Sequence, residues 1–247
     1  MSAPGTVYGL HAVRALIERG AARIETLYVQ RGHREGRLDA LLELARSARV
    51  HVEERAMNEL NAICSGARHQ GVVARVSAGS SLGEGALDDL LDRCTEAPLL
   101  LVLDGVQDPH NLGACLRTAD AAGAAGVIVP RDRAAGLSAT VRKVASGAAE
   151  SVPLVQVVNL ARTLRWLRER GLWVVGTDAD AAKSLYEADL RGPLAIVMGA
   201  EGTGLRRLTR ESCDVLVQIP MQGSVATLNV SVAAGVLLFE AIRQRRA

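Results

Sequence analysis

Hydrophobic residues in the first 76 positions alternate between the spacing of helices and that of strands. Apolar residues fall on one face of three segments, which we predict as helices over 10–20, 37–50 and 57–63. Strand-like runs lie at 24–30, just after the second helix at Val50, and at 70–76. This order predicts a small α/β unit.

A second α/β pattern begins after Pro98. Residues 99–103 (LLLVL) are a continuous apolar run, as expected of a parallel strand that is buried on both faces. Further strands are predicted at 126–130, 154–158, 172–177, 194–199 and 214–220, with helices that include 160–171 and 230–246. Alternating strands and helices predict βαβ units and a parallel sheet, and ligands of such sheets bind at the carboxyl ends of the strands.

The segment between these patterns differs from both in composition. It is rich in Ser and Gly from Ser77 and acidic toward Pro98. We predict a flexible linker over 77–97 with one or two helical turns, between domains at 1–76 and 98–247.

Composition and charge narrow the class of protein. Hydrophobic residues make up 49% and charged residues 23% of the 247, which excludes wholesale disorder. The net charge is +2, with two mildly basic regions flanking the acidic strip at 77–97. No run of 18 apolar residues occurs, and the N-terminus lacks the basic and apolar pattern of a secretory signal. We therefore expect a cytoplasmic protein with no membrane partner.

The cysteines and aromatic residues give little evidence of chemistry. Cys64, Cys94, Cys115 and Cys213 are scattered, without a CxxC pair or histidines at metal spacing, so we predict reduced thiols and no metal site. Cys115 is expected to pack as a small apolar residue. The chain has only 2 Trp, 3 Tyr and 1 Phe, which argues against a base-stacking platform.

Three polar loops follow predicted strands. In the first, Asn111 could cap a helix, and Gly113 could leave room beside Arg117 for a sugar or phosphate. Taken alone, this loop favours a surface ion pair between Arg117 and Asp120. The second, MGAEGTGL, carries Glu201 and glycines at 199, 202 and 204, and it is neither a Walker A loop nor a GxGxxG fingerprint.

The third loop joins the last strand to the last helix and contains Ser224, Thr227 and Asn229. Each of these residues suits a helix N-cap. Capping leaves unexplained why three polar, glycine-bearing loops are all predicted at one edge of one sheet.

Together the three loops resemble the signature motifs of the SpoU (TrmH-like) 2′-O-ribose RNA methyltransferases of the SPOUT class. The matching segments are NLGACLRT (111–118), IVMGAEGTGL (196–205) and IPMQGSVATLNVSVA (219–233), in the family's order. VYGLHAV and RHQGVVARV in the first domain resemble the L30e-like substrate-binding domain of enzymes that methylate a guanosine ribose in large-subunit (23S) rRNA.

The resemblance implies a fold, a cofactor and partners. It implies an α/β protein whose C-terminal parallel-sheet domain holds a deep trefoil knot, against the general rule that connections do not thread loops. It also implies S-adenosylmethionine bound in the knot, large-subunit rRNA as substrate, and a homodimer whose site draws on both subunits.

The resemblance also implies site residues. The cofactor contacts would be Thr177, Gly199, Ile219, Met221 and Leu228. The catalytic set would be Asn111, Arg117, Glu201 and Asn229. The family more often has Ser at position 227, where Thr227 keeps the hydroxyl.

The chemistry then expected is methyl transfer to a ribose oxygen, in which positioning contributes most. Because a guanidinium stays protonated, we expect Arg117 to stabilise the developing alkoxide rather than act as a general base, with Asn111 and Glu201 holding it. The first domain would hold RNA phosphates with arginines. The candidates are Arg14, Arg31, Arg34, Arg37 and Arg68.

Two alternatives stay open. The chain could act on tRNA or on another rRNA nucleotide, since the three motifs do not separate these substrates. It could also be a non-catalytic RNA-binding assembly factor. The intact set of Asn111, Arg117, Glu201 and Asn229 argues against the second alternative.

Overall fold

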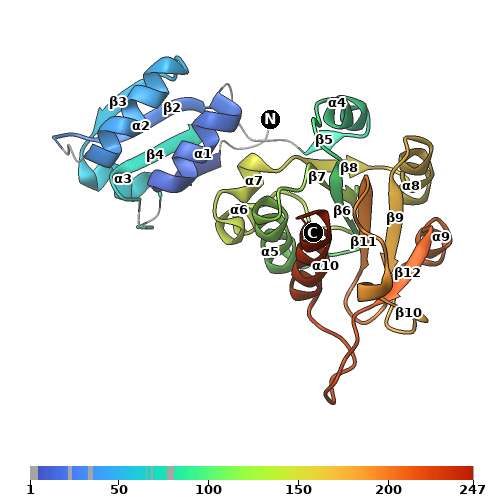
Figure 1. The fold of residues 1–247 in the computed structure, drawn as a ribbon. Coiled ribbons are helices and arrows are strands. Elements are labelled where there is room, and N and C mark those ends of the chain that lie inside the picture. Colours follow the sequence, from blue (N-terminus) through green and yellow to red (C-terminus); the bar gives the residue numbers. More distant parts are fainter. Residues whose placement is uncertain are drawn as a thin grey trace. The chain divides into compact units, whose positions relative to one another are not determined.

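The computed structural model describes residues 5–21, 24–32, 36–64, 66–67, 69–76 and 81–246. The chain divides into two compact units (Figure 1). The N-terminal unit is Met1–Ser80 with Ser146–Ser151, and the C-terminal unit is Ser81–Ala145 with Val152–Ala247. Among the described residues, no helix is long and apolar enough to cross a membrane.

The N-terminal unit is built on a four-stranded mixed sheet in the order β1-β4-β2-β3. Its elements are β1 (Gly5–Tyr8), α1 (Leu10–Gly20), β2 (Ile24–Gln30), α2 (Gly36–Ser47), β3 (Val52–Arg55), α3 (Met57–Ile63) and β4 (Val72–Val76). The helices predicted at 10–20 and 57–63 and the strand at 24–30 are confirmed at both ends. The first strand, β1, was not predicted.

Alternating residues of this sheet enter two separate cores. Leu27 of β2 and Val72 of β4 lie in a cluster with residues of α1 and α2, whereas Tyr28 and Val73 lie in a second cluster with Leu60 of α3. This alternation follows from the two-residue period of a strand. The sheet therefore carries helices on both faces.

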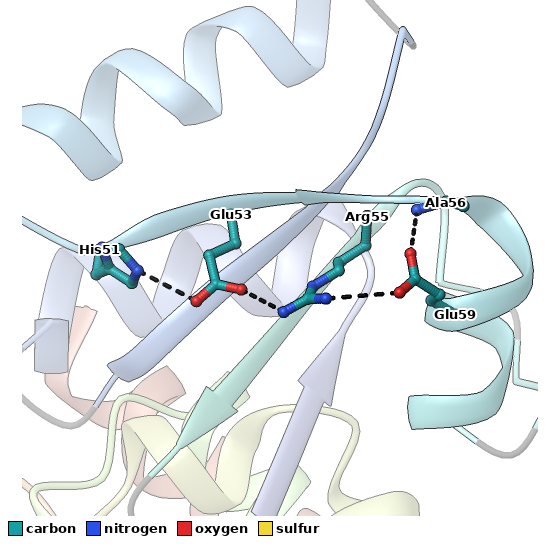
Figure 2. A network of polar contacts seen from close by, with 5 residues as sticks. All are labelled: His51, Glu53, Arg55, Ala56 and Glu59. Atoms are coloured by element: carbon teal, nitrogen blue, oxygen red, sulfur yellow. Dashed lines mark hydrogen bonds and ion pairs between the residues drawn. The ribbon is translucent and has the colours of Figure 1, made fainter.

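A chain of polar contacts ties β3 to the start of α3 (Figure 2). Glu53 accepts hydrogen bonds from His51 (3.2 Å) and Arg55 (2.6 Å). Arg55 also reaches Glu59 at 3.5 Å, and Glu59 accepts from the backbone N–H of Ala56 at 2.8 Å. The hydrogen bond from Arg55 is the main cause that lowers the pKa of Glu53, with a smaller contribution from His51, although burial opposes it.

The C-terminal unit is built on an eight-stranded parallel sheet in the order β10-β12-β9-β11-β6-β7-β8-β5. Its strands are β5 (Leu82–Gly83), β6 (Leu99–Asp104), β7 (Gly126–Pro130), β8 (Leu154–Val157), β9 (Trp173–Thr177), β10 (Lys183–Ser184), β11 (Leu194–Gly199) and β12 (Val215–Gln218). The α/β prediction with a parallel sheet is confirmed. Residues 99–103 are buried throughout, as the continuous apolar run predicts.

Helices connect these strands. They are α4 (Ala86–Asp92), α5 (Pro109–Ala121), α6 (Ala139–Ala145), α8 (Leu160–Glu169), α9 (Arg207–Glu211) and α10 (Val230–Arg246), with a 3₁₀ turn at Leu185–Glu187; α7 (Ala148–Ser151) lies in the N-terminal unit. In Figure 1, α5 and α10 lie side by side, in agreement with their contacts.

The described part of the segment expected to be a linker contains the expected helical turns, but it packs into the core of the C-terminal unit, as a flexible linker would not. Residues 82–83 form β5, which pairs with β8, and residues 86–92 form α4. Leu87 and Leu91 of α4 are buried in the core of the C-terminal unit. Four residues apart on one helix face, they dock the acidic segment onto the sheet. Residues 77–80 lie outside the described residues.

The register brings several strand ends to one edge. Gly199 at the end of β11 lies opposite Asp104 at the end of β6, and Val217 of β12 lies opposite Thr177 at the end of β9. The loops that follow these parallel strands therefore leave the sheet from the same edge, where ligands of such sheets bind.

Candidate active site

A cavity of about 360 Å³ opens at this carboxyl edge. We call it the sheet-edge pocket. It is lined by the loops that follow β9, β11 and β12. All five residues expected to contact a cofactor line it: Thr177, Gly199, Ile219, Met221 and Leu228. Glu201 lines it as well and is exposed.

The loop after β11 is a tight turn made of glycines. Backbone hydrogen bonds join Ala200 and Gly204 in both directions, at 2.9 and 3.2 Å. Gly202 and Gly204 have φ values of 80° and 64°, a region that L side chains rarely adopt. A Cβ at Gly199 would lie 2.2 Å from the carbonyl carbon of Gly204. The MGAEGTGL pattern is therefore required by the backbone itself.

An ion pair that sequence reasoning missed anchors this loop. The carboxylate of Asp104, with a fully buried side chain, accepts from the backbone N–H of Arg206 (3.0 Å) and from its Nε (2.5 Å). Asp104 is also the register partner of Gly199, so it contacts the region where the loop begins and binds the residue where it ends. The available signal was an acidic residue at the end of a fully apolar strand.

A second ion pair lies in the lining of the pocket itself. Arg210 of α9 reaches Asp178, just after β9, at 2.6 Å, and both residues line the pocket. The Thr177 hydroxyl donates to the carbonyl of Val197 on the neighbouring strand at 3.2 Å. These contacts fix the loop after β9 relative to β11.

Asn229 and Asn111 meet although 118 residues separate them. Asn229 Nδ2 donates to Asn111 Oδ1 at 2.9 Å, while Asn229 Oδ1 accepts from the backbone N–H of Ser231 at 3.0 Å. Asn229 is therefore the cap of α10, and the capping geometry turns its amide toward α5. This contact joins the first and third signature segments.

Two expectations about the first loop are wrong. The N-cap of α5 is Asp108, whose carboxylate accepts from the backbone N–H of His110 at 2.9 Å, so Asn111 lies inside the first turn. Gly113 leaves no room for a ligand, because a Cβ there would lie 2.7 Å from Cβ of Val144 on α6. The missing side chain serves helix packing.

Of the expected catalytic set, Glu201 lines the sheet-edge pocket, whereas Asn111, Asn229 and Arg117 do not. Arg117 also differs from the two asparagines, which bond each other. It is exposed on α5, it does not line the sheet-edge pocket, and it forms no hydrogen bond or ion pair with the described residues. The surface pair with Asp120 is thus not formed. Asn111 and Asn229 are brought together, and Glu201 lies on the pocket.

The thiols are placed as packing residues. All four cysteines are free, and burial raises the pKa of Cys115 to about 12. A thiol with so high a pKa carries no thiolate at neutral pH. Among the described residues, no group of three or more His, Cys, Asp or Glu side chains is arranged to hold a metal ion.

Two family models match the chain. Residues 98–239 match the SpoU rRNA Methylase family, which covers more than half of the sequence. The chain belongs to the SpoU rRNA methylase family. Residues 6–81 of this SpoU methylase match the model for RNA 2′-O ribose methyltransferase substrate binding.

Curated relatives of this SpoU methylase share its full length. It is 57% identical over 246 residues to the 23S rRNA (guanosine-2′-O-)-methyltransferase RlmB of Pseudomonas putida, a match that covers 100% of this chain and 99% of the relative. It is 59% identical to the protein of the same name from Pseudomonas aeruginosa, over 97% of this chain and 96% of that one.

A solved structure shares its architecture. The SpoU methyltransferase AviRb from Streptomyces viridochromogenes, in complex with the cofactor AdoMet, matches this SpoU methylase with a TM-score of 0.77 and 28% identity. The match covers 98% of this chain and 90% of that chain.

Proposed function

We propose that this chain transfers a methyl group from S-adenosylmethionine to the 2′-oxygen of a guanosine ribose in 23S rRNA. The observation that carries the proposal is that the loops after β9, β11 and β12, two of which hold signature motifs, line the sheet-edge pocket in a chain that matches 23S rRNA guanosine methyltransferases over 97–100% of its length. We assign rRNA binding to residues 1–76 and catalysis to 98–247. Since its substrate is ribosomal RNA, we place the enzyme in the cytoplasm.

The residues of the sheet-edge pocket fit the proposed cofactor. Apolar side chains, among them Ile219, Met221 and Leu228, offer surface for an adenine ring. The carboxylates of Asp178, Asp180 and Glu201 lie on the same pocket against one guanidinium, that of Arg210, which pairs with Asp178. The lining is therefore negative on balance, which favours a sulfonium cation. The missing Cβ at Gly199 keeps the turn compact. When bound, S-adenosylmethionine supplies the electrophilic methyl group.

The remaining chemistry belongs to the protein. As the ribose oxygen gains the methyl group, the sulfur–methyl bond of the donor breaks and the hydroxyl proton is released, and we assign that proton to solvent water. We assign Arg117 to the oxygen or the adjacent phosphate, where its guanidinium stabilises the developing negative charge. Glu201 is suited to hold that guanidinium, because a carboxylate accepts two parallel N–H bonds. Asn229 and Asn111 fix the N-terminal end of α10 against α5 beside this site.

Methyl transfer to rRNA tests the proposal. Purified protein, radiolabelled S-adenosylmethionine and 23S rRNA should give labelled RNA, and nuclease mapping should place the label on the ribose of one guanosine. Arg117→Ala should abolish this transfer while cofactor affinity, measured by calorimetry, stays within about twofold. Label on tRNA alone, or on a base, would exclude the proposed reaction.

We also propose that the enzyme is a homodimer whose active site takes Arg117 from the second protomer. Arg117 is exposed on α5 and does not line the pocket that Glu201 lines, and α5 packs beside α10. Val232 and Phe239 of α10 are seven residues apart, on one helix face, and are 53% and 50% exposed. An apolar stripe on the helix next to Arg117, which forms no ion pair in the described part of the chain, fits a contact with a second copy.

Subunit complementation tests this arrangement. Arg117→Ala and Glu201→Ala should each be inactive alone. A mixed dimer regains one intact site if Arg117 and Glu201 come from different protomers, so mixing and refolding the two variants should restore activity. If the mixture stays inactive while both variants dimerise normally, each protomer holds a complete site.

The trefoil knot remains part of this proposal. It is supported by the path of the chain, which reaches β12 beyond β9 and then returns through α10 to pack on α5 and β11. An experimentally determined chain trace through 199–206 and 219–230 would show whether the C-terminal segment passes through the preceding loop.

A further inference from the structure

The N-terminal unit contains a second pocket, of about 510 Å³, which we call the amide pocket. That volume lies within the roughly 300–1,000 Å³ of pockets that hold small molecules. It is lined by Leu10, Gln30, Arg37, Leu38, Met57, Asn61, Gly66, Ala67, His69, Gln70 and Gly71. All of these residues belong to the N-terminal unit.

A buried histidine fixes the first amide of this pocket. Nδ1 of His69 accepts from the backbone N–H of Gly71 at 3.1 Å, so the ring proton lies on Nε2. Nε2 donates to Oδ1 of Asn61 at 3.1 Å. His69 is 3% exposed and is held by both contacts. The oxygen of the Asn61 amide is therefore tied to the protein, and its NH₂ group has no partner among the described residues.

The second amide, that of Gln70, is also held through its oxygen, which leaves its NH₂ group to face the pocket. Oε1 of Gln70 accepts from the backbone N–H of Leu10 at 3.2 Å. Gln70 has a φ of 51°, a conformation uncommon outside glycine, which this bond helps to hold. Its NH₂ group likewise has no partner in the part of the chain that the structure describes. Both amides thus present donors.

The rest of the pocket adds one more set of donors and an apolar wall. Arg37 is exposed on the first turn of α2 and forms no ion pair with the described residues. Met57, which is 50% exposed, and the buried Leu38 contribute apolar surface. A ligand that matches this lining has flat apolar faces and an edge made of hydrogen-bond acceptors.

We propose that the amide pocket binds an unpaired guanine of the RNA substrate and reads its N7 and O6 edge. Guanine presents two acceptors there, whereas adenine presents an acceptor and a donor, and that donor would face an NH₂ group. Unpaired bases are the parts of RNA that proteins read by sequence. Arg37 pairs with a neighbouring phosphate. This inference rests on the proposed function, because it takes RNA as the substrate.

The test compares two RNA stems that differ in one bulged nucleotide, guanosine or adenosine. Their binding to the full-length protein is measured by fluorescence anisotropy at one fixed salt concentration. We expect the guanosine stem to bind about tenfold more tightly, near the lower end of what a well-placed base contact contributes. Equal affinity for the two stems overturns the proposal and leaves binding to the phosphate backbone alone.

Asn61→Asp replaces the donor with an acceptor and keeps the oxygen that His69 needs. It should remove the preference for guanosine and weaken the guanosine complex about tenfold. Asn58→Asp is the matched control, because it makes the same change on the exposed surface of the same helix without lining the pocket. It should keep the preference. Equal losses in both variants would mean that added charge alone is responsible, and would overturn the proposal.

Gln70→Glu makes the same exchange at the second amide and guards against a folding defect in a single variant. Uptake of S-adenosylmethionine by each variant reports that the C-terminal unit is intact. The experiments distinguish failure of the guanine-binding proposal from failure of the proposed function. Wild-type protein that methylates 23S rRNA but binds both stems equally refutes the pocket alone, and protein that prefers the guanosine stem but transfers no methyl group refutes the function alone.

Discussion

The sheet-edge pocket is shaped mainly by backbone turns, whereas the amide pocket is shaped mainly by side chains. At the sheet edge, the glycine turn at 199–204 leaves no space for a Cβ at its first residue, and a buried carboxylate anchors its end. In the N-terminal unit, Asn61 and Gln70 are exposed residues, each oriented by one hydrogen bond. The first pocket should therefore tolerate few substitutions, while the second should change its ligand preference before it loses its fold.

The largest expected effect comes from the anchor of the sheet-edge loop. Arg206→Ala leaves the buried Asp104 carboxylate with only the backbone N–H of residue 206. Removing one partner of a fully buried pair costs about 3–5 kcal/mol, and we expect about 2–3 because the Arg206 side chain is half-exposed and the N–H remains. Urea unfolding followed by circular dichroism measures the loss.

Arg207→Ala is the matched control for this anchor. Arg207 pairs with Glu211 on the exposed surface of α9 at 2.8 Å, so its removal should change stability little. If the two variants unfold alike, the Asp104 pair does not anchor the loop. The preference of the amide pocket for guanosine should be the same in both.

Gly199→Ala tests the backbone turn directly. The added methyl group can be accommodated only if the 199–204 turn moves, at a cost of about 2 kcal/mol, within the range for overpacking. We expect S-adenosylmethionine to bind about thirtyfold more weakly by calorimetry. Gly192→Ala is the control, since nothing lies within 4 Å of its Cβ position. Unchanged affinity in Gly199→Ala would mean that the turn is not part of the cofactor site.

The same contrast explains which features the sequence could predict. Glycines at 199, 202 and 204 and the apolar run at 99–103 are patterns that the backbone demands, so the strands and the loop could be located in advance. Burial of Gly113 against Val144 depends on two segments that meet only in the folded chain. The spacing of residues 111–118 could not distinguish packing space from ligand space.

Side-chain partners were the hardest features to predict. Asp108 and Asn111 are equally good caps by type, and only the position of Pro109 at the start of the helix selects Asp108. Asp104 falls just after the strand predicted at 99–103, and the sequence gives no sign of its role because its partner, Arg206, is 102 residues away. Leu87 and Leu91 lie among acidic residues, so the sequence of this segment is typical of an exposed linker and does not indicate that they are buried. Arg34 and Arg68, expected as RNA contacts, lie outside the described residues.

A smaller effect on stability is expected toward the C-terminal end of α10. Glu240, buried on α10, accepts from Arg243 and from Gln244, each at 2.8 Å, and Gln244 also binds the backbone of Ala188 and Leu190. The Arg243 bond is the main cause that lowers the pKa of Glu240 to about 2, although burial opposes it. Because the folded pKa lies below the ordinary 4.5, this stabilisation is present above about pH 4.5 and is lost as the pH falls toward 2.

Glu240→Gln checks this pH dependence. The variant should be less stable than the wild type near neutral pH, and the difference should shrink between pH 4.5 and 2, where the wild-type carboxylate takes up a proton. Urea unfolding at several pH values measures it. Parallel stability curves for the two proteins over this range would show that Glu240 does not titrate as its contacts imply.

The smallest effect on stability is expected for Arg55→Gln in the network of Figure 2, which contrasts with the Asp104 pair. Arg55 is about as exposed as Arg206, but the carboxylates it bonds, Glu53 and Glu59, are accessible to water, whereas that of Asp104 is buried. Water can replace the lost partner, and Arg75 still covers the Tyr28 ring that Arg55 contacts, so thermal unfolding should change little. The pKa of Glu53 should nevertheless rise, because the Arg55 bond is the main cause that lowers it, and carboxylate chemical shifts in NMR titrations would report this. A rise in the pKa of Glu53 without a loss of stability would show that the Arg55 pair changes only the ionisation of Glu53, whereas the Asp104 pair stabilises the fold of a loop. A stability loss as large as that of Arg206→Ala would mean that exposure does not distinguish the two networks.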